Sequence, residues 1–429
     1  MAAALAFALP QVSHAAEPWT LQSALSLPDG LKLSGLFRVR YEGLTGQARV
    51  GLGANTDVYT TRGTLEAEYD AGPVRFDVEV EDSRAFGATP RTGITSNDVN
   101  VFELLQAYIL ADVKTPIGPG LVQAGRFIIP SLGSRRLISG GDDRNASTGF
   151  TGVKLDTKAA NGTAVTLLFT APQIRLPDDL PSVLDNKWGF DHESLDLVLW
   201  GGFVARPKLF GAAGVDFGFV GLDERDKPGR PTRNRRLRTA TARVIRPTQP
   251  GQFNYEAEAG YQFGSIARTL AANAPRQDVS AYFLHLEAGY QFDGPAHARV
   301  SALYDLASGD EGKDRYGRFD SLYGMRRRDY ASGGLFAAVG RTNISSPGLT
   351  LDATPTLRIE AYFSYRTLWL ASTTDSFSTT GVRDPAGASG SYAGQLVEAR
   401  MRYWVIPHSL RFEIDGLTLI KGRFLKTAP

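Results

Sequence analysis

Charged residues recur at every second position in short segments of this sequence, with arginines next to acids. Arg400 and Arg402 follow Glu398 at this spacing, and Arg411 precedes Glu413. In an extended strand, residues two apart point to the same side, so each such set forms one charged face. Guanidinium groups bind carboxylates through paired hydrogen bonds, and such a face could coordinate an acidic solute. The same ions could instead pair with one another and hold neighbouring strands together, and the spacing leaves both interpretations open.

The opposite face of these segments is apolar and aromatic. Within residues 32–42, Phe37, Val39 and Tyr41 alternate with Arg38 and Arg40. Lipid outside and water inside explain an apolar face this wide opposite a face that carries full charges, so the pattern is typical of an all-β, transmembrane antiparallel barrel with a polar lumen. The expected lipid-facing band comprises Phe37, Val39, Tyr41, Leu65, Tyr69, Tyr282, Leu284, Leu286, Tyr290, Phe412 and Ile414.

The alternation predicts seventeen strands. They are 31–42, 56–70, 73–83, 101–113, 120–129, 149–157, 162–170, 195–206, 213–222, 236–246, 252–263, 280–292, 296–306, 330–341, 355–368, 394–405 and 408–420. Short and long connections alternate between them, as in outer-membrane barrels with short periplasmic turns, and both chain ends are therefore expected on the periplasmic side. Such barrels ordinarily have an even number of strands. Either one segment is misassigned or a closing strand is missing after residue 420; we favour the second, giving about 18 strands.

Composition and charge narrow the class of protein. The 429 residues include no cysteine, which excludes disulfides and thiolate metal sites. Basic and acidic residues number 47 and 45 and are interleaved, which argues against nucleic-acid binding. Residues 1–16 form an apolar stretch typical of a secretory signal peptide, although an N-terminal tail is the alternative. Residues 17–429 are then expected to form a single outer-membrane barrel domain.

Catalytic and metal sites find little support in the sequence. The five histidines are scattered, and no pair has metal-ligand spacing, so we expect neither metal nor cofactor. His192, close to Asp191 and Ser194, is the one candidate for a hydrolytic triad, but a loop contains such a trio by chance. We therefore expect a protein that is not an enzyme.

Two long connections are rich in cations. One carries Arg225, Lys227, Arg230, Arg233, Arg235 and Arg236, and the other ends in Arg326, Arg327 and Arg328. These side chains could bind phosphates of outer-membrane lipid and lipopolysaccharide, or they could form a funnel that attracts a polyanion. The sequence leaves both interpretations open.

Several stretches, in their order along the chain, resemble the outer-membrane alginate export family. They are residues 37–42, 125–127, 134–138, 142–145, 149–153, 304–310, 319–324, 340–343 and 420–424. The resemblance implies an eighteen-stranded barrel whose arginine-rich constriction passes an anionic polyuronate from the periplasm to the exterior. By motif, it places pore arginines at Arg38 or Arg40, Arg126, Arg135, Arg136 and Arg144, with Arg341, Arg358, Arg400 and Arg402 as further candidates. Asp143 and Thr151 depart from the family pattern, which leaves the identity of the polymer open.

Three functions therefore remain to be weighed. The first is passive, arginine-guided diffusion of alginate or a related polyuronate, with periplasmic scaffold or export partners. The second is a general or small-anion-selective porin with the same barrel, and the third is a hydrolase that uses His192. The long connections 131–148 and 171–194 are expected to act as gates in either channel.

Overall fold

A computed structural model describes residues 21–140, 144–227, 229–325, 329–331 and 334–429, and these residues form one seventeen-stranded sheet. The strands are β1 (Leu31–Thr45), β2 (Asn55–Asp70), β3 (Val74–Phe86), β4 (Asn100–Thr115), β5 (Gly118–Ile128), β6 (Gly149–Lys158), β7 (Ala164–Pro172), β8 (Leu197–Phe210), β9 (Ala213–Glu224), β10 (Arg236–Arg246), β11 (Gln252–Ala267), β12 (Arg276–Gln291), β13 (Arg299–Ala307), β14 (Ile344–Thr356), β15 (Ile359–Trp369), β16 (Tyr392–Ile406) and β17 (Leu410–Lys421). Three five-residue helices accompany them: α1 (Leu21–Leu25), α2 (Leu180–Leu184) and α3 (Arg423–Thr427). The expected signal peptide, 1–16, lies outside the described residues.

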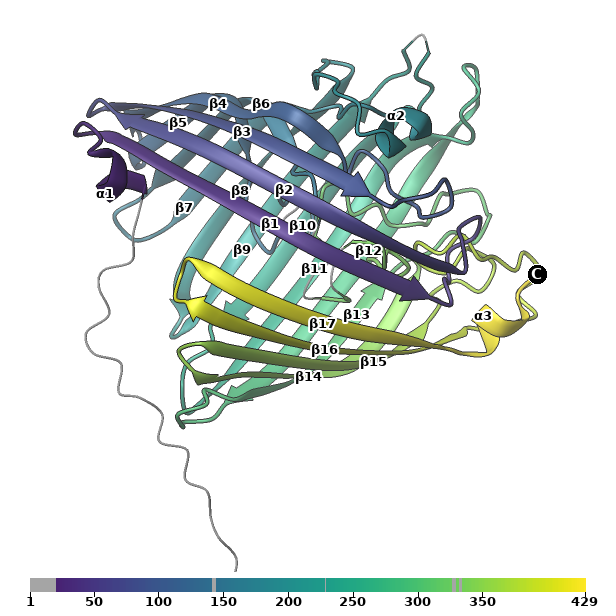
Figure 1. The fold of residues 1–429 in the computed structure, drawn as a ribbon. Helices are drawn as coiled ribbons and strands as arrows, with labels where there is room; N and C mark the ends of the chain where they lie inside the picture. The colour runs from purple at the N-terminus through teal and green to yellow at the C-terminus, as the bar shows by residue number, and fades with distance from the viewer. Residues whose placement is uncertain (1–20, 141–143, 228, 326–328, 332–333) are drawn as a thin grey trace, which may run out of the picture.

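Every strand pairs antiparallel with the next one along the chain, from β1 with β2 to β16 with β17. The sheet curves round into a barrel in which β1 and β17 are the facing edges, without pairing to each other in the described ranges (Figure 1). The sequence-based prediction of an all-β antiparallel barrel is confirmed. No helix among the described residues is long and apolar enough to cross a membrane.

The connections divide into a short set and a long set at opposite ends of the barrel. Residues 116–117 and 357–358 are short connections, whereas 129–148 and 308–343 are long ones. With an odd number of strands, β1 begins at the short-connection end and β17 finishes at the long-connection end (Figure 1). The expectation that both chain ends lie on one side is therefore wrong for the described chain.

One predicted strand is also wrong. Its described residues, 330–331 and 334–341, belong to the connection between β13 and β14, and the strand follows at Ile344–Thr356. The sequence pattern does not indicate this strand because it contains two prolines, Pro347 and Pro355. Proline lacks the backbone N–H that donates to the neighbouring strand, so it is uncommon within strands. The apolar character of 330–341 has another cause: the connection packs inside the barrel, where Ala338 is fully buried. The other sixteen predicted strands overlap observed ones.

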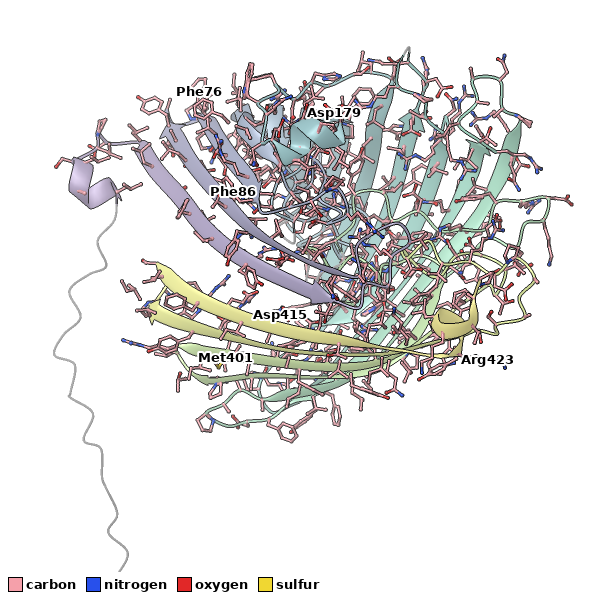
Figure 2. All side chains as sticks on the ribbon, turned by 45° about the vertical axis from the view of Figure 1, so that its right-hand side comes forward. Phe76, Phe86, Asp179, Met401, Asp415 and Arg423 are labelled. Carbon is pink, nitrogen blue, oxygen red and sulfur yellow. The ribbon has the colours of Figure 1, made fainter. Side chains whose placement is uncertain are left out.

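The inverted polarity expected from the sequence is present in the barrel wall. Phe37 is 76% exposed on the outer face, whereas the inward-facing Glu81 is only 1% exposed. The outward-facing Phe76 and Met401, labelled in Figure 2, are also exposed. Apolar side chains therefore surround the barrel, and charged side chains fill its interior.

Two long connections enter the lumen and contact each other there. The Ser139 amide donates to the Tyr323 carbonyl (3.1 Å), and the Tyr323 amide donates to the Leu137 carbonyl (3.0 Å). Ile138 and Phe150 are fully buried in the apolar cluster that forms around them. Packed loop segments thus fill part of the lumen.

Candidate functional site

A cavity of about 780 Å³ lies in the lumen at the short-connection end; we call it the vestibule. It is lined by the ends of β10 and β16 and the starts of β13 and β15, and by loop residues above them. Its charged lining consists of seven arginines (Arg135, Arg136, Arg243, Arg246, Arg299, Arg400 and Arg402) and five carboxylates (Glu256, Glu287, Asp329, Asp352 and Glu360). The lining therefore carries an excess of two positive charges.

Strand β16 supplies two arginines that the alternation of the sequence predicts. The Arg400 guanidinium lies 4.9 Å from the centre of the Tyr362 ring, a cation–π distance. Arg402 lies between two carboxylates, 3.2 Å from Glu360 and 2.7 Å from Glu413. Stacking and ion pairing hold both guanidinium groups against the wall, from which they face the cavity.

The connection 129–148 supplies the other two predicted arginines of the vestibule. Arg135 is exposed and has φ +72°, a left-handed conformation that is uncommon for residues other than glycine. Its carbonyl accepts the Met325 amide (3.0 Å), which ties this turn to the second loop. Arg136 is only 5% exposed and lies 2.6 Å from Glu258 and 3.1 Å from Asp329. Neighbouring arginines thus have different surroundings: one is open to the cavity and one is buried among carboxylates.

Above the vestibule lies a buried set of ions, here called the inner network: Arg136, Arg341, Arg366, His285, Asp305 and Asp329. Fully buried Asp305 of β13 lies 3.0 Å from Arg366, 3.5 Å from Arg341 and 2.8 Å from Nδ1 of His285.

Asp329 of the second loop joins Arg136 to Arg341. Burial by itself would raise the pKa of Asp329, but these two guanidinium groups hold it well below its usual range. The loop carboxylate is therefore ionised and occupies the two arginines.

A second cavity, of about 520 Å³, lies toward the long connections; we call it the outer cavity. Arg233, Arg235 and Arg318 line it together with Glu224 and Asp320.

Residues along strand β11 show where the two cavities lie relative to the inner network. Glu256 lines the vestibule, Gln262 lines the outer cavity, and Glu258, which binds Arg136, lies between them. Glu258 therefore holds Arg136 of the inner network at a level between the two cavities.

Besides Arg341, five predicted arginines lie outside the vestibule lining. Arg126 lies 2.6 Å from both Glu103 and Glu193, and Arg40 lies 3.1 Å from Glu42.

Arg38 donates to the Arg144 carbonyl (2.9 Å), and Arg144 donates to Asn97 (2.6 Å). Arg358 was expected on a strand, but it is exposed in the turn between β14 and β15. The structure brings Arg135, Arg136, Arg400 and Arg402 together in the vestibule and places Arg341 in the network directly above.

Sequence reasoning missed three vestibule arginines, namely Arg243, Arg246 and Arg299. A signal was present for Arg299, because it shares the inward face of β13 with Ser301 and Asp305 at alternate positions. Arg299 donates to Asn254 (3.0 Å) and pairs with Glu287. Arg243 links Asp216 (2.8 Å) to Glu256 (3.0 Å) across neighbouring strands.

The hydrolytic trio around His192 is not assembled in the structure. The Asp191 carboxylate is buried and accepts hydrogen bonds from Asn100 (3.0 Å) and the Leu176 amide (2.8 Å). Ser194 donates to Asp196 (3.0 Å), and His192 is exposed. Across the described ranges, no three His, Asp or Glu side chains are arranged to hold a metal ion. The expected cations 326–328 and the acids 142–143 lie outside those ranges.

The sequence model of the family described as alginate export matches residues 33–429. The chain belongs to the alginate export family. The resemblance seen in its motifs is thus confirmed. Since this family consists of outer-membrane transport barrels, the protein is an outer-membrane β-barrel of the porin type. No curated protein matches the chain.

Solved porin structures share the fold at low sequence identity. A BenF-like porin from Pseudomonas fluorescens Pf-5 has a TM-score of 0.58 and 13% identity, covering 91% of this chain and 93% of its own. OpdK from Pseudomonas aeruginosa with vanillate has a TM-score of 0.57 and 13% identity, covering 90% and 92%. OccK2 (OpdF) from Pseudomonas aeruginosa in complex with glucuronate has a TM-score of 0.53 and 14% identity, covering 90% of each chain.

Proposed function

We propose that this barrel is a passive channel for an anionic polysaccharide of the polyuronate class, alginate or a related polymer. The observation that carries the proposal is the vestibule, where seven arginines face five carboxylates at the short-connection end of the lumen. The family match supports the same substrate class, and two of the similar porins were solved with the carboxylate-bearing ligands glucuronate and vanillate.

The chemistry of the lining suits a chain of uronate carboxylates. A guanidinium group has five N–H donors in a rigid fork, so an arginine that already binds one protein carboxylate can also bind a passing one. Arg402 and Arg243 each hold two protein carboxylates at 2.7–3.2 Å. A polyuronate that exchanges with these internal partners would move from one arginine to the next without a large change in total ion pairing. Such movement follows the polymer gradient and needs no cofactor.

A channel for small anions is the second candidate, because the lumen of the described chain contains cavities of about 780 and 520 Å³. Cavities of this size match ligand sites for small solutes. A polymer would require the inner network between them to open, whereas a monomeric acid needs a smaller displacement. The two candidates therefore predict different behaviour toward oligomers and monomers.

The test measures reversal potential and current across a planar bilayer that contains the purified barrel. We expect anion selectivity and a block by short oligouronates that is at least about tenfold stronger than the block by the monomer, because linked carboxylates bind several arginines at once. Equal block by monomer and oligomer would favour the small-anion channel. No anion selectivity and no block would contradict both candidates.

A double variant assigns the effect to the vestibule. Arg135→Gly with Arg400→Gln removes two guanidinium groups, and glycine suits the left-handed backbone at 135. Selectivity and block should both fall severalfold. Arg236→Gln with Arg276→Gln is the matched control, because it removes the same charge from the outer face of the barrel. If both double variants lowered selectivity equally, the vestibule arginines would not be the selective element.

A further inference from the structure

The outer face of β9–β12 carries polar side chains in a row beside the long connections. The register places Arg236 of β10 opposite Asp223 of β9 and Ser265 of β11, and Ser265 opposite Asp278 of β12. Arg276, at the start of β12, donates to the Ser265 hydroxyl (2.6 Å). These residues share the outward face, because their neighbours Leu237 and Val279 are buried on the inner one. The two arginines therefore flank the same stretch of β11.

An aromatic belt lies directly below this row. Phe219, Tyr261, Phe263 and Tyr282 are 39–48% exposed on the same outward face. Neighbouring rings are in contact: the Phe219 and Phe263 centroids are 6.4 Å apart, and those of Tyr261 and Phe263 are 6.2 Å apart. Such belts mark the interface between hydrocarbon and headgroups.

The spacing along β11 places the polar row at the headgroup level. Phe253, at the short-connection end, and Phe263 are both exposed and lie ten residues apart. Ten residues span about 33 Å of strand, which corresponds to about 25 Å of bilayer in a tilted barrel strand. Ser265 lies two residues beyond Phe263, so the row begins where the apolar band ends.

One arginine near this row is already neutralised. Arg238 lies 2.9 Å from Asp223 and 4.9 Å from the centre of the Trp200 ring, and the Trp200 indole donates to the same carboxylate (2.9 Å). Arg236 and Arg276 are exposed next to these contacts of Arg238.

The adjoining connections carry further basic residues, some of which are exposed and some of which are paired with carboxylates. Arg225 and Arg268 are exposed near the same strand ends, whereas Lys227 pairs with Asp196 (3.2 Å) and Arg230 with Asp178 (3.5 Å). The row has two carboxylates: Asp223 binds Arg238, which leaves Asp278 beside the four exposed arginines Arg225, Arg236, Arg268 and Arg276. The surface at this level is therefore net positive.

We propose that this set, the outer arginine row, binds the phosphate groups of an outer-leaflet glycolipid. Phosphate accepts several charge-assisted hydrogen bonds, and guanidinium matches its geometry. The acyl chains of the same molecule would lie against the aromatic belt, which borders the polar row on the side of the apolar band. The proposal concerns the outer wall and is independent of what passes through the lumen.

Native mass spectrometry of the detergent-purified full chain tests this binding. The probes are bisphosphorylated lipid A, its dephosphorylated form and inorganic phosphate. We expect lipid A to bind much more tightly than the dephosphorylated lipid, with inorganic phosphate failing to compete at comparable concentration. Arg236→Gln with Arg276→Gln should weaken lipid A binding by roughly thirtyfold, as expected for the loss of two basic residues at an anionic lipid surface.

Two further variants keep the result interpretable. Arg236→Lys with Arg276→Lys retains the charges and should retain most of the binding. Arg135→Gly with Arg400→Gln, which removes the same charge from the lumen, should leave lipid binding unchanged. Equal binding of the phosphorylated and dephosphorylated lipids by the unaltered protein would overturn the proposal even if a variant failed to fold. Equal weakening by the outer and lumenal variants would overturn it as well.

Discussion

The vestibule and the inner network are built from the same residue types, yet they differ in access to solvent. In the vestibule, exposed Arg135 and half-buried Arg400 face an open cavity with an excess of positive charge. In the inner network, Arg341 and Arg366 are 3% and 1% exposed and share Asp305. Open arginines can attract a solute, whereas buried ones must be neutralised by the protein itself.

The comparison shows that the number of arginines in a lumen does not by itself identify the solute-binding part of the pore. A buried ion pair contributes little net stability, but removing one partner leaves an uncompensated charge and costs several kcal/mol. An exposed ion pair contributes little in either direction. Substitutions in the two regions should therefore affect different properties: folding stability in the inner network and selectivity in the vestibule.

Asp305→Ala should have the largest effect. It removes the carboxylate shared by His285, Arg341 and Arg366. The free energy of unfolding should fall by about 3–5 kcal/mol, the cost of breaking a buried ion pair. Urea unfolding of the barrel in lipid vesicles, followed by tryptophan fluorescence, measures it. Asp293→Ala, at an exposed turn, is the control and should stay within about 0.5 kcal/mol of the unaltered protein. Equal loss in both variants would show that the inner network has no special structural role.

Asp329→Asn should have an intermediate effect, on ligand binding, because Asp329 belongs to the inner network and also lines the vestibule. The substitution removes the loop carboxylate that occupies Arg136 and Arg341, so the barrier between the cavities becomes more positive. Block by oligouronate should become about three- to tenfold stronger, which corresponds to roughly 1 kcal/mol of added Coulomb attraction.

The control for this substitution is Asp314→Asn, an exposed position in the same connection. It changes the net charge equally without touching the network, and it should leave the block as it is. If the two variants behaved alike, Asp329 would not compete with the solute for these arginines. The current-block assay of the proposed function gives both values.

The strands of the barrel could be predicted from the sequence because their period of two is physical. One face of each strand contacts apolar surroundings and the other faces a charged lumen. The residue type therefore indicates the side to which residues such as Phe37 and Arg400 point. The prediction failed at β14, where Pro347 and Pro355 interrupt the pattern while the neighbouring loop is apolar. That loop is apolar because it packs against other loops inside the lumen, a tertiary contact that has no period along the chain.

The candidate site was predictable in part for the same reason. Arg400 and Arg402 lie on a strand, so their direction follows from alternation. The positions of Arg136 and Arg341 depend on how two loops meet across the lumen, and only the family resemblance indicated them. Pairs such as Arg136 with Glu258 join residues far apart in the chain, and no local signal specifies them.

Salt concentration should also distinguish the vestibule from the inner network. The Debye length falls from about 10 Å at 0.1 M salt to about 3 Å at 1 M, and this screens exposed charges much more than buried ones. Anion selectivity, which depends on the open arginines of the vestibule, should therefore drop strongly between these two concentrations of KCl. The difference in unfolding free energy between the unaltered protein and Asp305→Ala should change by less than about 0.5 kcal/mol, because the inner network is shielded from solvent. Reversal potentials and urea unfolding in the same two buffers give both quantities. If the stability difference collapsed with salt as steeply as the selectivity did, the inner network would be reached by solvent ions, and the barrier between the two cavities would be open in solution.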